Sequence, residues 1–207
     1  MEFLDNLIEK LIKVEHGFLL FEQEARSIAS YNTVQESLDT ASRLIESDYY
    51  QVRSTAVFIY GYIAHRYPPA IKILYDLACS DTSWQVQEMI AKAFDQFCKD
   101  NGYEKSLPEI KRWVFDDYPN VCRAVTEGLR IWTGRPFFKD HPSVAIELIS
   151  FNKSNDSEYL RKSVGNSLRD IAKKFPELVE RETSTWDLTD DKIKLTFKHA
   201  LVKKNIG

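Results

Sequence analysis

The sequence predicts an all-α solenoid, a stack of helix pairs, and three observations lead to that prediction. The chain of 207 residues contains only seven glycines, which fits helices joined by short connections better than it fits a β fold. An apolar pattern with helical spacing recurs four times along the chain. Each copy follows a turn rich in serine, aspartate or asparagine, the residues that cap helix N-termini.

The repeat is clearest in four predicted helices that are each anchored on a branched aliphatic residue. The anchors, 34, 35 and 39 residues apart, are Val52, Val86, Val121 and Leu160. Further apolar residues follow each anchor by four, eight and eleven positions; after Val52 these are Ala56, Tyr60 and Ile63. This spacing places the apolar side chains on one face of a helix, which must therefore be buried against neighbouring helices.

A shorter apolar helix is predicted before each of these four helices, over residues 33–46, 69–79, 105–115 and 142–151. Prolines help to mark where these helices begin, because proline is tolerated in a first turn but breaks a helix interior. They are Pro68, Pro69, Pro108 and Pro142. Two helices in each 34–39 residues is a HEAT-type pattern, and one pair alone cannot bury its apolar face.

We therefore predict a single domain over residues 1–207, wound as a right-handed α–α superhelix. Residues 31–174 supply about four helix-pair repeats, and residues 1–30 and 175–207 supply capping helices at the two ends. A chain of this length buries roughly 70% of the surface that it exposes when unfolded, which is ample for one core.

Composition excludes several classes of protein. No stretch approaches the roughly 20 apolar residues that span a bilayer, and the acidic N-terminus lacks the layout of a secretion signal. The cysteines Cys79, Cys98 and Cys122 lack metal-ligand spacing, as do the four histidines. We therefore expect a cytoplasmic monomer with no metal and no cofactor, whose cysteines are small core residues.

The charge distribution says more about binding partners than the total does. The net charge is −3, made up of −6 in residues 1–50 and +3 in residues 51–207. A concave surface can be basic although the whole molecule is acidic, so nucleic acid remains a possible partner. A random scatter of solvated charges explains the same asymmetry equally well.

Three segments resemble one protein family. They are residues 83–94, SWQVQEMIAKAF; residues 120–130, NVCRAVTEGLR; and residues 159–170, YLRKSVGNSLRD. In this order and at repeat spacing, they are similar to the bacterial HEAT-like-repeat DNA alkylation repair family, the AlkD-like and AlkC-like DNA glycosylases. The resemblance covers roughly residues 47–185. It implies a partner, double-stranded DNA that is alkylated or structurally distorted.

The resemblance also implies roles for individual residues. Glu88 matches the catalytic carboxylate, which stabilises the oxocarbenium charge on deoxyribose as the bond to a cationic N3- or N7-alkylpurine breaks. Trp84 lies one turn earlier and offers cation–π attraction of about 0.5–2 kcal/mol. Arg123 matches the arginine that holds a backbone phosphate. Other basic residues on equivalent helices would extend a phosphate-contacting strip: Arg53, Arg130, Arg161, Lys162 and Arg169.

Structural explanations exist for the same residues. Trp84 fits a packed aromatic at a helix start, and Glu88 fits a first-turn glutamate stabilised by the helix dipole. Arg123 fits an ion pair with Glu127, four residues later. A solvated helix face explains three of the basic residues as well as DNA contact does: Arg161, Lys162 and Arg169.

One position departs from the family pattern. Where active glycosylases of this kind are expected to carry a second tryptophan, this chain has Asn166, so the aromatic clamp around the damaged nucleotide loses one wall. The acidic segment of about 46 residues before the first strong repeat also repels phosphate.

Three functions are compatible with these observations, and the sequence does not decide whether the chain is an enzyme. The first is a monofunctional DNA glycosylase for cationic N3- and N7-alkylpurines, in which Glu88 stabilises the oxocarbenium. The second is a non-catalytic protein that binds damaged or branched DNA, which Asn166 and the acidic N-terminus favour. The third is a protein-interaction scaffold, which the net acidity favours.

Overall fold

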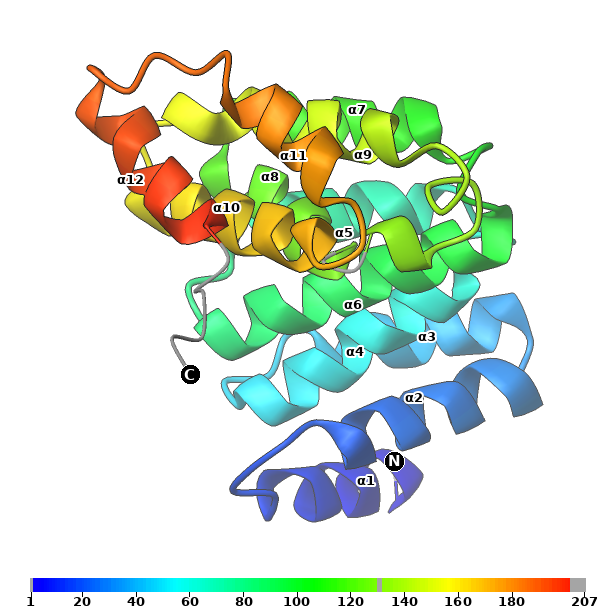
Figure 1. Ribbon diagram of the computed structural model, residues 1–207. Coiled ribbons are helices and arrows are strands. Elements are labelled where there is room, and N and C mark those ends of the chain that lie inside the picture. Colours follow the sequence, from blue (N-terminus) through cyan, green and yellow to red (C-terminus); the bar gives the residue numbers. More distant parts are fainter. Residues whose placement is uncertain (1, 130–131, 202–207) are drawn as a thin grey trace, which may run out of the picture. The chain divides into compact units, whose positions relative to one another are not determined.

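The computed structural model describes residues 2–129 and 132–201, and all regular secondary structure within those ranges is helical (Figure 1). The chain divides into two compact units, Met1–Asn101 and Gly102–Gly207. We describe each unit separately. The prediction of one continuous domain over the whole chain therefore stays a prediction.

The first unit contains six helices within its described residues 2–101, which lie in two layers (Figure 1). They are α1 (Glu2–Ile12), α2 (Leu19–Tyr31), α3 (Val34–Leu44), α4 (Tyr50–Ile63), α5 (Pro69–Ser80) and α6 (Trp84–Asn101). In one layer, α4 packs between α2 and α6. In the other, α3 packs against α2 and α4, and α5 packs against α4 and α6, while α1 packs against α4.

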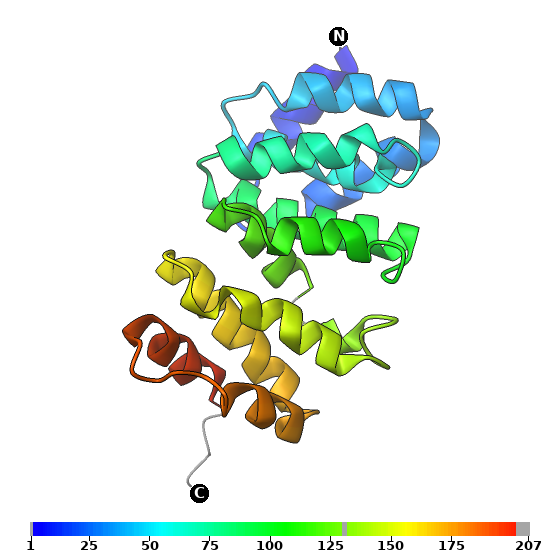
Figure 2. The same ribbon diagram turned by 90° about the horizontal axis from the view of Figure 1, so that it is seen from above.

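The second unit repeats this arrangement with shorter helices (Figure 2). They are α7 (Leu107–Val114), α8 (Pro119–Gly128), α9 (Pro142–Ser150), α10 (Glu158–Ala172), α11 (Pro176–Thr183) and α12 (Asp191–Ala200). Two short 3₁₀ helices, η1 (Trp132–Gly134) and η2 (Phe151–Ser154), flank α9. In one layer α10 packs between α8 and α12, and in the other α9 packs between α7 and α11.

The predicted repeat appears directly in the structure. The four predicted long helices are α4, α6, α8 and α10, and the four shorter partners are α3, α5, α7 and α9. All four anchors are completely buried: Val52, Val86, Val121 and Leu160. The expected serine cap is present at α10, where the Ser157 hydroxyl accepts a hydrogen bond from the backbone N–H of Leu160. The predicted all-α fold of stacked helix pairs is confirmed.

Two glycines allow helices of the same layer to approach each other closely. A Cβ atom added at Gly61 of α4 would lie 2.8 Å from the Cα atom of Ala93 in α6. A Cβ atom added at Gly165 of α10 would lie 2.6 Å from the carbonyl oxygen of Thr196 in α12. Both distances are too short for real atoms, so only glycine allows the two helix backbones to come this close.

Aromatic side chains fill much of the core of each unit. Phe21, Tyr60 and Phe94 are buried in the first unit, and Trp113 and Trp132 are buried in the second. None of the three cysteines forms a disulfide: Cys98 and Cys122 are buried, as expected, and Cys79 is half-buried. Among residues 2–129 and 132–201, no group of histidine, cysteine and acidic side chains could hold a metal ion, and no helix is long and apolar enough to cross a membrane.

Candidate functional site

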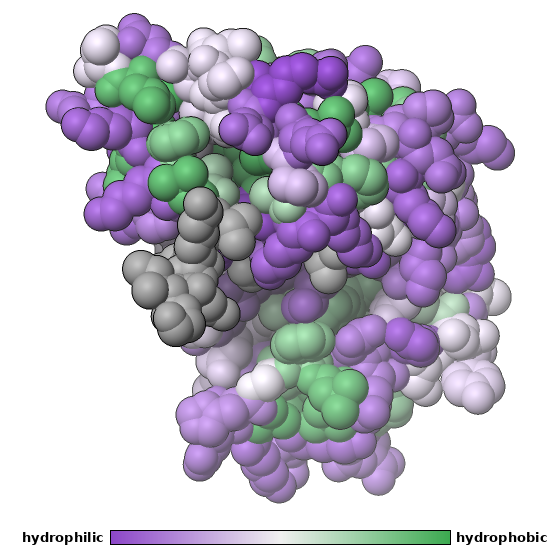
Figure 3. Space-filling view, in the orientation of Figure 1, coloured by the Kyte–Doolittle hydropathy of each residue, from purple (hydrophilic) through white to green (hydrophobic). Residues whose placement is uncertain are grey.

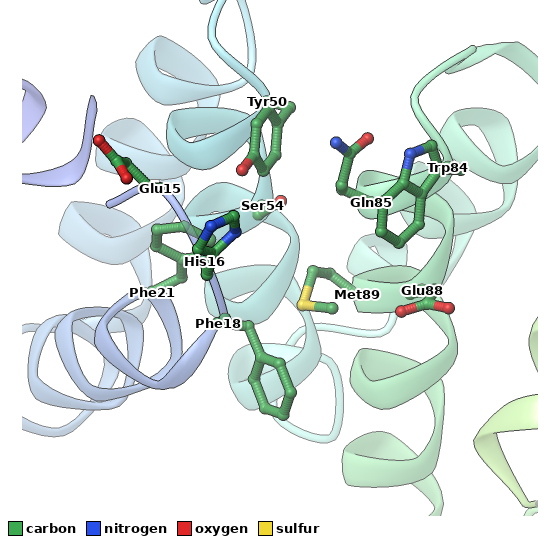
Figure 4. Close-up of a pocket in the computed structure, with 11 residues that line it drawn as sticks. Glu15, His16, Phe18, Phe21, Tyr50, Ser54, Trp84, Gln85, Glu88 and Met89 are labelled. Carbon is green, nitrogen blue, oxygen red and sulfur yellow. The ribbon is translucent and has the colours of Figure 1, made fainter. Parts of the chain in front are cut away.

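A cavity of about 370 Å³ opens in the first unit, where the N-terminal turns of α4 and α6 lie across from the turn between α1 and α2 (Figure 4). Its lining residues are Glu15, His16, Gly17, Phe18, Phe21, Tyr50, Ser54, Trp84, Gln85, Glu88 and Met89. The cavity therefore brings together two residues that the sequence analysis singled out, Trp84 and Glu88. Figure 3 shows apolar side chains gathered over α2 and α4 on one face of this unit.

Trp84 and Glu88 lie on the first two turns of α6, on the same side of the helix. The Trp84 side chain is 62% exposed, so it is not a packed core aromatic. Glu88 is also exposed, and no hydrogen bond or ion pair within residues 2–129 and 132–201 engages its carboxylate. An indole face and a free carboxylate therefore lie together at the edge of the cavity.

The turn before α6 fixes where these two side chains lie. The carboxylate of Asp81 accepts a hydrogen bond from the backbone N–H of Ser83, at 2.8 Å. The amide of Gln87 donates to the carbonyl oxygens of Ala78, at 3.1 Å, and Asp81, at 2.7 Å. Because Gln87 is buried, these bonds tie the start of α6 firmly to the end of α5.

Aromatic side chains form the wall opposite α6. The rings of Phe21 and Tyr50 pack edge to face, with centroids 6.5 Å apart. Phe18 packs against Phe58, with centroids 6.3 Å apart, and the ammonium of Lys92 lies 4.3 Å from the centroid of the Phe18 ring. Aromatic faces attract cations, so this wall suits a ligand that carries positive charge.

The turn between α1 and α2 contributes residues that the sequence analysis did not single out. Glu15 and His16 are exposed there, and Gly17 adopts a φ of 84°, which favours glycine. The amide of Gln51 in α4 donates to the carbonyl oxygen of Val14, at 3.3 Å, and so holds this turn beside the cavity. Figure 4 shows Glu15 and Glu88 on opposite sides of the cavity.

Ser54 of α4 is the least exposed polar residue of the cavity. Its side chain is fully buried, and its hydroxyl has no hydrogen-bond partner within the described protein. The repeat pattern gave no signal for this residue, because serine is common on either face of a helix.

Two of the predicted DNA-contacting arginines are held within the protein. The Nε atom of Arg53 lies 2.8 Å from the Asp81 carboxylate, and its Nη1 donates to the carbonyl oxygens of Ser47 and Asp48, both at 2.9 Å. Arg161 makes the same backbone bonds in the second unit, to the carbonyl oxygens of residues 155 and 156, at 2.5 and 3.0 Å. Each arginine therefore ties its helix to the turn that precedes it.

Arg123 lies two residues after the anchor of α8, one position later than Arg53 and Arg161 follow theirs, and makes different contacts. Its side chain is buried, and the guanidinium lies 4.0 Å from the centroid of the Tyr159 ring. Its Nε atom has no hydrogen-bond partner, and no ion pair joins it to Glu127 in the described part of the chain. Arg123 is thus held by stacking rather than by the turn.

The remaining predicted residues lie on α10, with one exception. Lys162 pairs with the carboxylate of Glu158 at 2.6 Å, and Arg169 donates to the carbonyl oxygen of His199 at 3.3 Å. Asn166 is half-buried on the same helix. Arg130 lies outside the described residues. These side chains belong to the second unit, whereas Trp84 and Glu88 belong to the first, so their assembly into one site stays a prediction.

Comparison with known sequences gives two matches. Residues 21–181 match the sequence model of a family described as DNA alkylation repair enzyme. The chain is also 32% identical over 108 residues to the uncharacterized protein YhaZ of Bacillus subtilis strain 168. That alignment covers 49% of this chain and 30% of YhaZ, so the shared segment is a minor part of the relative.

Comparison with solved structures gives closer matches. The fold is similar to AlkD2 from Streptococcus mutans, with a TM-score of 0.93, 43% identity and 96% of each chain covered. It is also similar to smu.31 from Streptococcus mutans UA159, with a TM-score of 0.89, 41% identity, and 99% of this chain and 100% of the other covered. The alkylpurine DNA glycosylase AlkC from Pseudomonas fluorescens, solved with DNA containing an abasic site analog, has a TM-score of 0.55 and 21% identity. That match covers 97% of this chain and 61% of AlkC, and it concerns the fold alone.

Proposed function

The chain belongs to the DNA alkylation repair enzyme family, and we propose on that basis that it excises cationic N3- and N7-alkylated purines from double-stranded DNA. Glu88 is the carboxylate that stabilises positive charge on the sugar, and Trp84 is the aromatic residue that contacts the damaged nucleotide. The reaction needs no metal and no cofactor, because the positive charge of the alkylated base already makes it a good leaving group.

One observation carries this proposal: an exposed indole and an unpaired carboxylate lie one turn apart on α6, at the edge of a cavity. A carboxylate with no protein partner keeps its charge available to a cationic ligand. The aromatic wall across the cavity adds a surface that attracts cations. This combination suits a positively charged nucleotide better than it suits a neutral or anionic ligand.

The proposed chemistry is hydrolysis of the glycosidic bond. The bond between C1′ and the base nitrogen breaks, and its electron pair stays on the base, which leaves neutral. Positive charge develops on the sugar, where the Glu88 carboxylate stabilises it. Water then adds to C1′ and loses a proton, which Glu88 can accept. The products are a free alkylpurine and an abasic site.

A group of cations in the second unit supports DNA binding. The pKa of His199 is lowered, mainly because the imidazole is partly buried and further because Lys162, Arg169 and Lys198 lie near it. Three cations lie close to one imidazole on α10 and α12, and although Glu158 pairs with Lys162, positive charge is in excess there in a chain that is acidic as a whole. Such a surface would contact backbone phosphates and give no preference for base sequence.

Release of 7-methylguanine and 3-methyladenine from methylated duplex DNA tests the proposal. We expect wild-type protein to release these bases faster than they leave DNA spontaneously, and Glu88→Gln to slow release by about 10²–10³-fold, the usual loss for one charge-stabilising group. Glu104→Gln, which neutralises an exposed carboxylate outside the cavity, is the matched control and should release bases at the wild-type rate. Release by wild type no faster than the spontaneous rate would rule out excision of these bases.

A second function, DNA binding without excision, is favoured by Asn166 and by another consequence of the unpaired Glu88 carboxylate. No described residue holds the Glu88 carboxylate in one orientation, whereas catalysis usually needs a fixed group. The half-buried Asn166 also stands where a second tryptophan is expected. Under this function, wild type and Glu88→Gln would bind damaged or branched DNA more tightly than intact duplex, and neither would release a base.

A further inference from the structure

The residue that follows each buried anchor makes the same kind of bond in all four repeats. Its side chain donates to the carbonyl oxygen six residues earlier, in the turn before the helix. The donors, at 2.9, 2.7, 3.1 and 2.5 Å, are Arg53, Gln87, Cys122 and Arg161. The third repeat therefore uses a thiol where two others use a guanidinium. Burial raises the pKa of the Cys122 thiol to about 11, so the sulfur keeps the proton that it donates.

Arg123, the residue after Cys122, is therefore not needed for the bond to the turn. Its side chain is 6% exposed, yet its guanidinium makes no hydrogen bond or ion pair with residues 2–129 and 132–201. The Nε atom is enclosed, whereas the two terminal nitrogens keep contact with solvent. A nearly buried cation without a counterion or an acceptor is unfavourable for folding. Its presence is explained by a ligand with negative oxygens, which match the paired N–H groups of a guanidinium.

Tyr159 holds this guanidinium from one side. The ring belongs to the first turn of α10, which packs against α8, and its centroid lies 4.0 Å from the Arg123 guanidinium carbon. The Tyr159 residue is 51% exposed, and its hydroxyl makes no hydrogen bond within the described chain. Stacking on an aromatic face fixes the plane of a guanidinium and leaves the N–H groups at its edge unused.

We propose that Tyr159 is a positioning residue, which holds Arg123 in the orientation that binds a phosphate of the DNA backbone. The nature of the ligand rests on the DNA binding of the proposed function; the stacked and unpaired guanidinium does not. In this repeat the tyrosine ring takes the place of the turn carbonyl oxygens that hold Arg53 and Arg161. Arg123 is thereby fixed before DNA arrives, so less side-chain freedom is lost on binding.

The salt dependence of duplex binding, measured by fluorescence anisotropy, tests this role. One phosphate contact contributes about 0.9 to the slope of log affinity against log salt, however many contacts are made elsewhere. Arg123→Met should make the slope shallower by about this amount and lower the affinity about tenfold. Tyr159→Leu should also make the slope shallower, toward that of Arg123→Met, although it removes no charge. Its affinity should fall about threefold to tenfold.

Two control variants separate positioning from a general effect on the fold. Tyr159→Phe keeps the ring and should retain the wild-type affinity and slope. Tyr118→Leu is the matched control, because Tyr118 in the same unit is 55% exposed and no cation within the described chain lies on its ring. It should also keep the wild-type slope. Partial unfolding would lower the amount of binding protein without changing the slope.

A double variant completes the test. Arg123→Met combined with Tyr159→Leu should bind no more weakly than Arg123→Met alone, because the two residues act through one contact. The proposal is overturned by a wild-type slope in Tyr159→Leu, by a shallower slope in Tyr159→Phe or Tyr118→Leu, or by additive losses in the double variant.

The excision assay separates this proposal from the proposed function. If bases leave DNA in a Glu88-dependent reaction but Tyr159→Leu keeps the wild-type slope, the positioning role fails and the glycosylase function stands. If Tyr159→Leu loses the phosphate contact but wild-type protein releases no base, the glycosylase function fails and the positioning role stands.

Discussion

Arg53 and Arg161 show how one residue position serves the fold in the first and the fourth of the four repeats. Each follows its buried anchor by one residue, and each guanidinium donates to the carbonyl oxygens five and six residues earlier. Carbonyl oxygens in the turn before a helix have no partner in regular secondary structure, and hydrogen bonds from a charged donor are strong. The basic residue after the anchor is therefore explained by stability, without reference to DNA.

We predict that Arg53→Met lowers the free energy of unfolding by about 2 kcal/mol, because it removes charged hydrogen bonds that are partly shielded from water. Urea denaturation measures this loss. Affinity for duplex DNA should be unchanged in the folded variant. Lys162→Met is the contrasting variant, since its pair with Glu158 is exposed and should contribute little to stability. Weaker DNA binding by Arg53→Met at unchanged stability would contradict the structural role.

A second prediction at this scale concerns pH and His199. The pKa of His199 is lowered by burial first, then by Lys162, Arg169 and Lys198, and Glu158 opposes the shift. The unfolded chain therefore takes up a proton at higher pH than the folded chain does. The stabilising effect is fully present above the ordinary histidine pKa of 6.5, and it is lost as the pH falls from 6.5 through the lowered pKa of the folded chain.

Thermal melting at several pH values between about 8 and 5 checks this prediction. We expect the melting temperature of wild type to fall over this range more than that of His199→Gln, which keeps a polar side chain that does not titrate. Parallel curves for the two proteins would show that His199 does not contribute to the pH dependence of stability.

The candidate site was predictable from sequence only in part. Trp84 and Glu88 share one helix, so their spacing of four residues predicts that they lie together. Glu15 and Ser54 reach the same cavity from two different elements, and no periodic pattern records contacts of that kind. The sequence also did not predict that the Arg53 side chain contacts protein rather than DNA, because its partner, Asp81, lies 28 residues away in the chain.

At the scale of helices, glycine controls how closely α4 approaches α6 and how closely α10 approaches α12. Alanine in place of a helical glycine usually stabilises a protein, by up to about 1 kcal/mol. We predict the opposite sign here: Gly61→Ala and Gly165→Ala should each destabilise by about 1–3 kcal/mol, because the added methyl group overlaps the facing helix. Chemical denaturation measures both, and a gain in stability would show that these helices can separate without cost.

The helices themselves were largely predictable from the sequence, because each long helix has an apolar face and follows a turn rich in serine, aspartate or asparagine.

The conformation of the connection between α8 and α9 was not predictable from the sequence. Phe137 there adopts a φ of 67°, which is unusual for a residue with a Cβ atom. Phe138 packs edge to face on the buried Trp132, with centroids 5.0 Å apart. Tertiary contacts of this kind offset backbone strain. They follow no periodic pattern of residues, so the sequence does not predict them.

At the scale of the whole molecule, the question is how a chain of net charge −3 would bind a polyanion. A local surface that contacts three phosphates gives a slope of about −2.7 in a plot of log affinity against log salt, so a fourfold rise in salt weakens binding roughly fortyfold. We predict a dependence of this size for duplex DNA, measured by fluorescence anisotropy. Lys162→Met with Arg169→Met should flatten the slope whether or not the DNA is damaged.

The absence of DNA binding even at low salt would contradict both DNA functions and leave the protein-interaction scaffold. The cations Lys162 and Arg169 belong to the second unit and Glu88 belongs to the first, so substitutions in the two units should have different effects on DNA binding and on base release. Changes at Lys162 and Arg169 should weaken binding of all duplexes alike, whereas a change at Glu88 should affect base release alone. This separation needs no assumption about how the two units are arranged.

The exposure of Trp84 has an optical consequence. Trp113 and Trp132 are fully buried and Trp186 is 6% exposed, whereas Trp84 is 62% exposed, and these are all four tryptophans of the chain. Its emission is therefore the component shifted to longer wavelength and open to collisional quenchers. Because Glu15 and Glu88 lie beside it, caesium should quench this component more efficiently than iodide. A ring stacked on the indole would shield it from both, so the protein carries its own spectroscopic reporter of an occupied cavity.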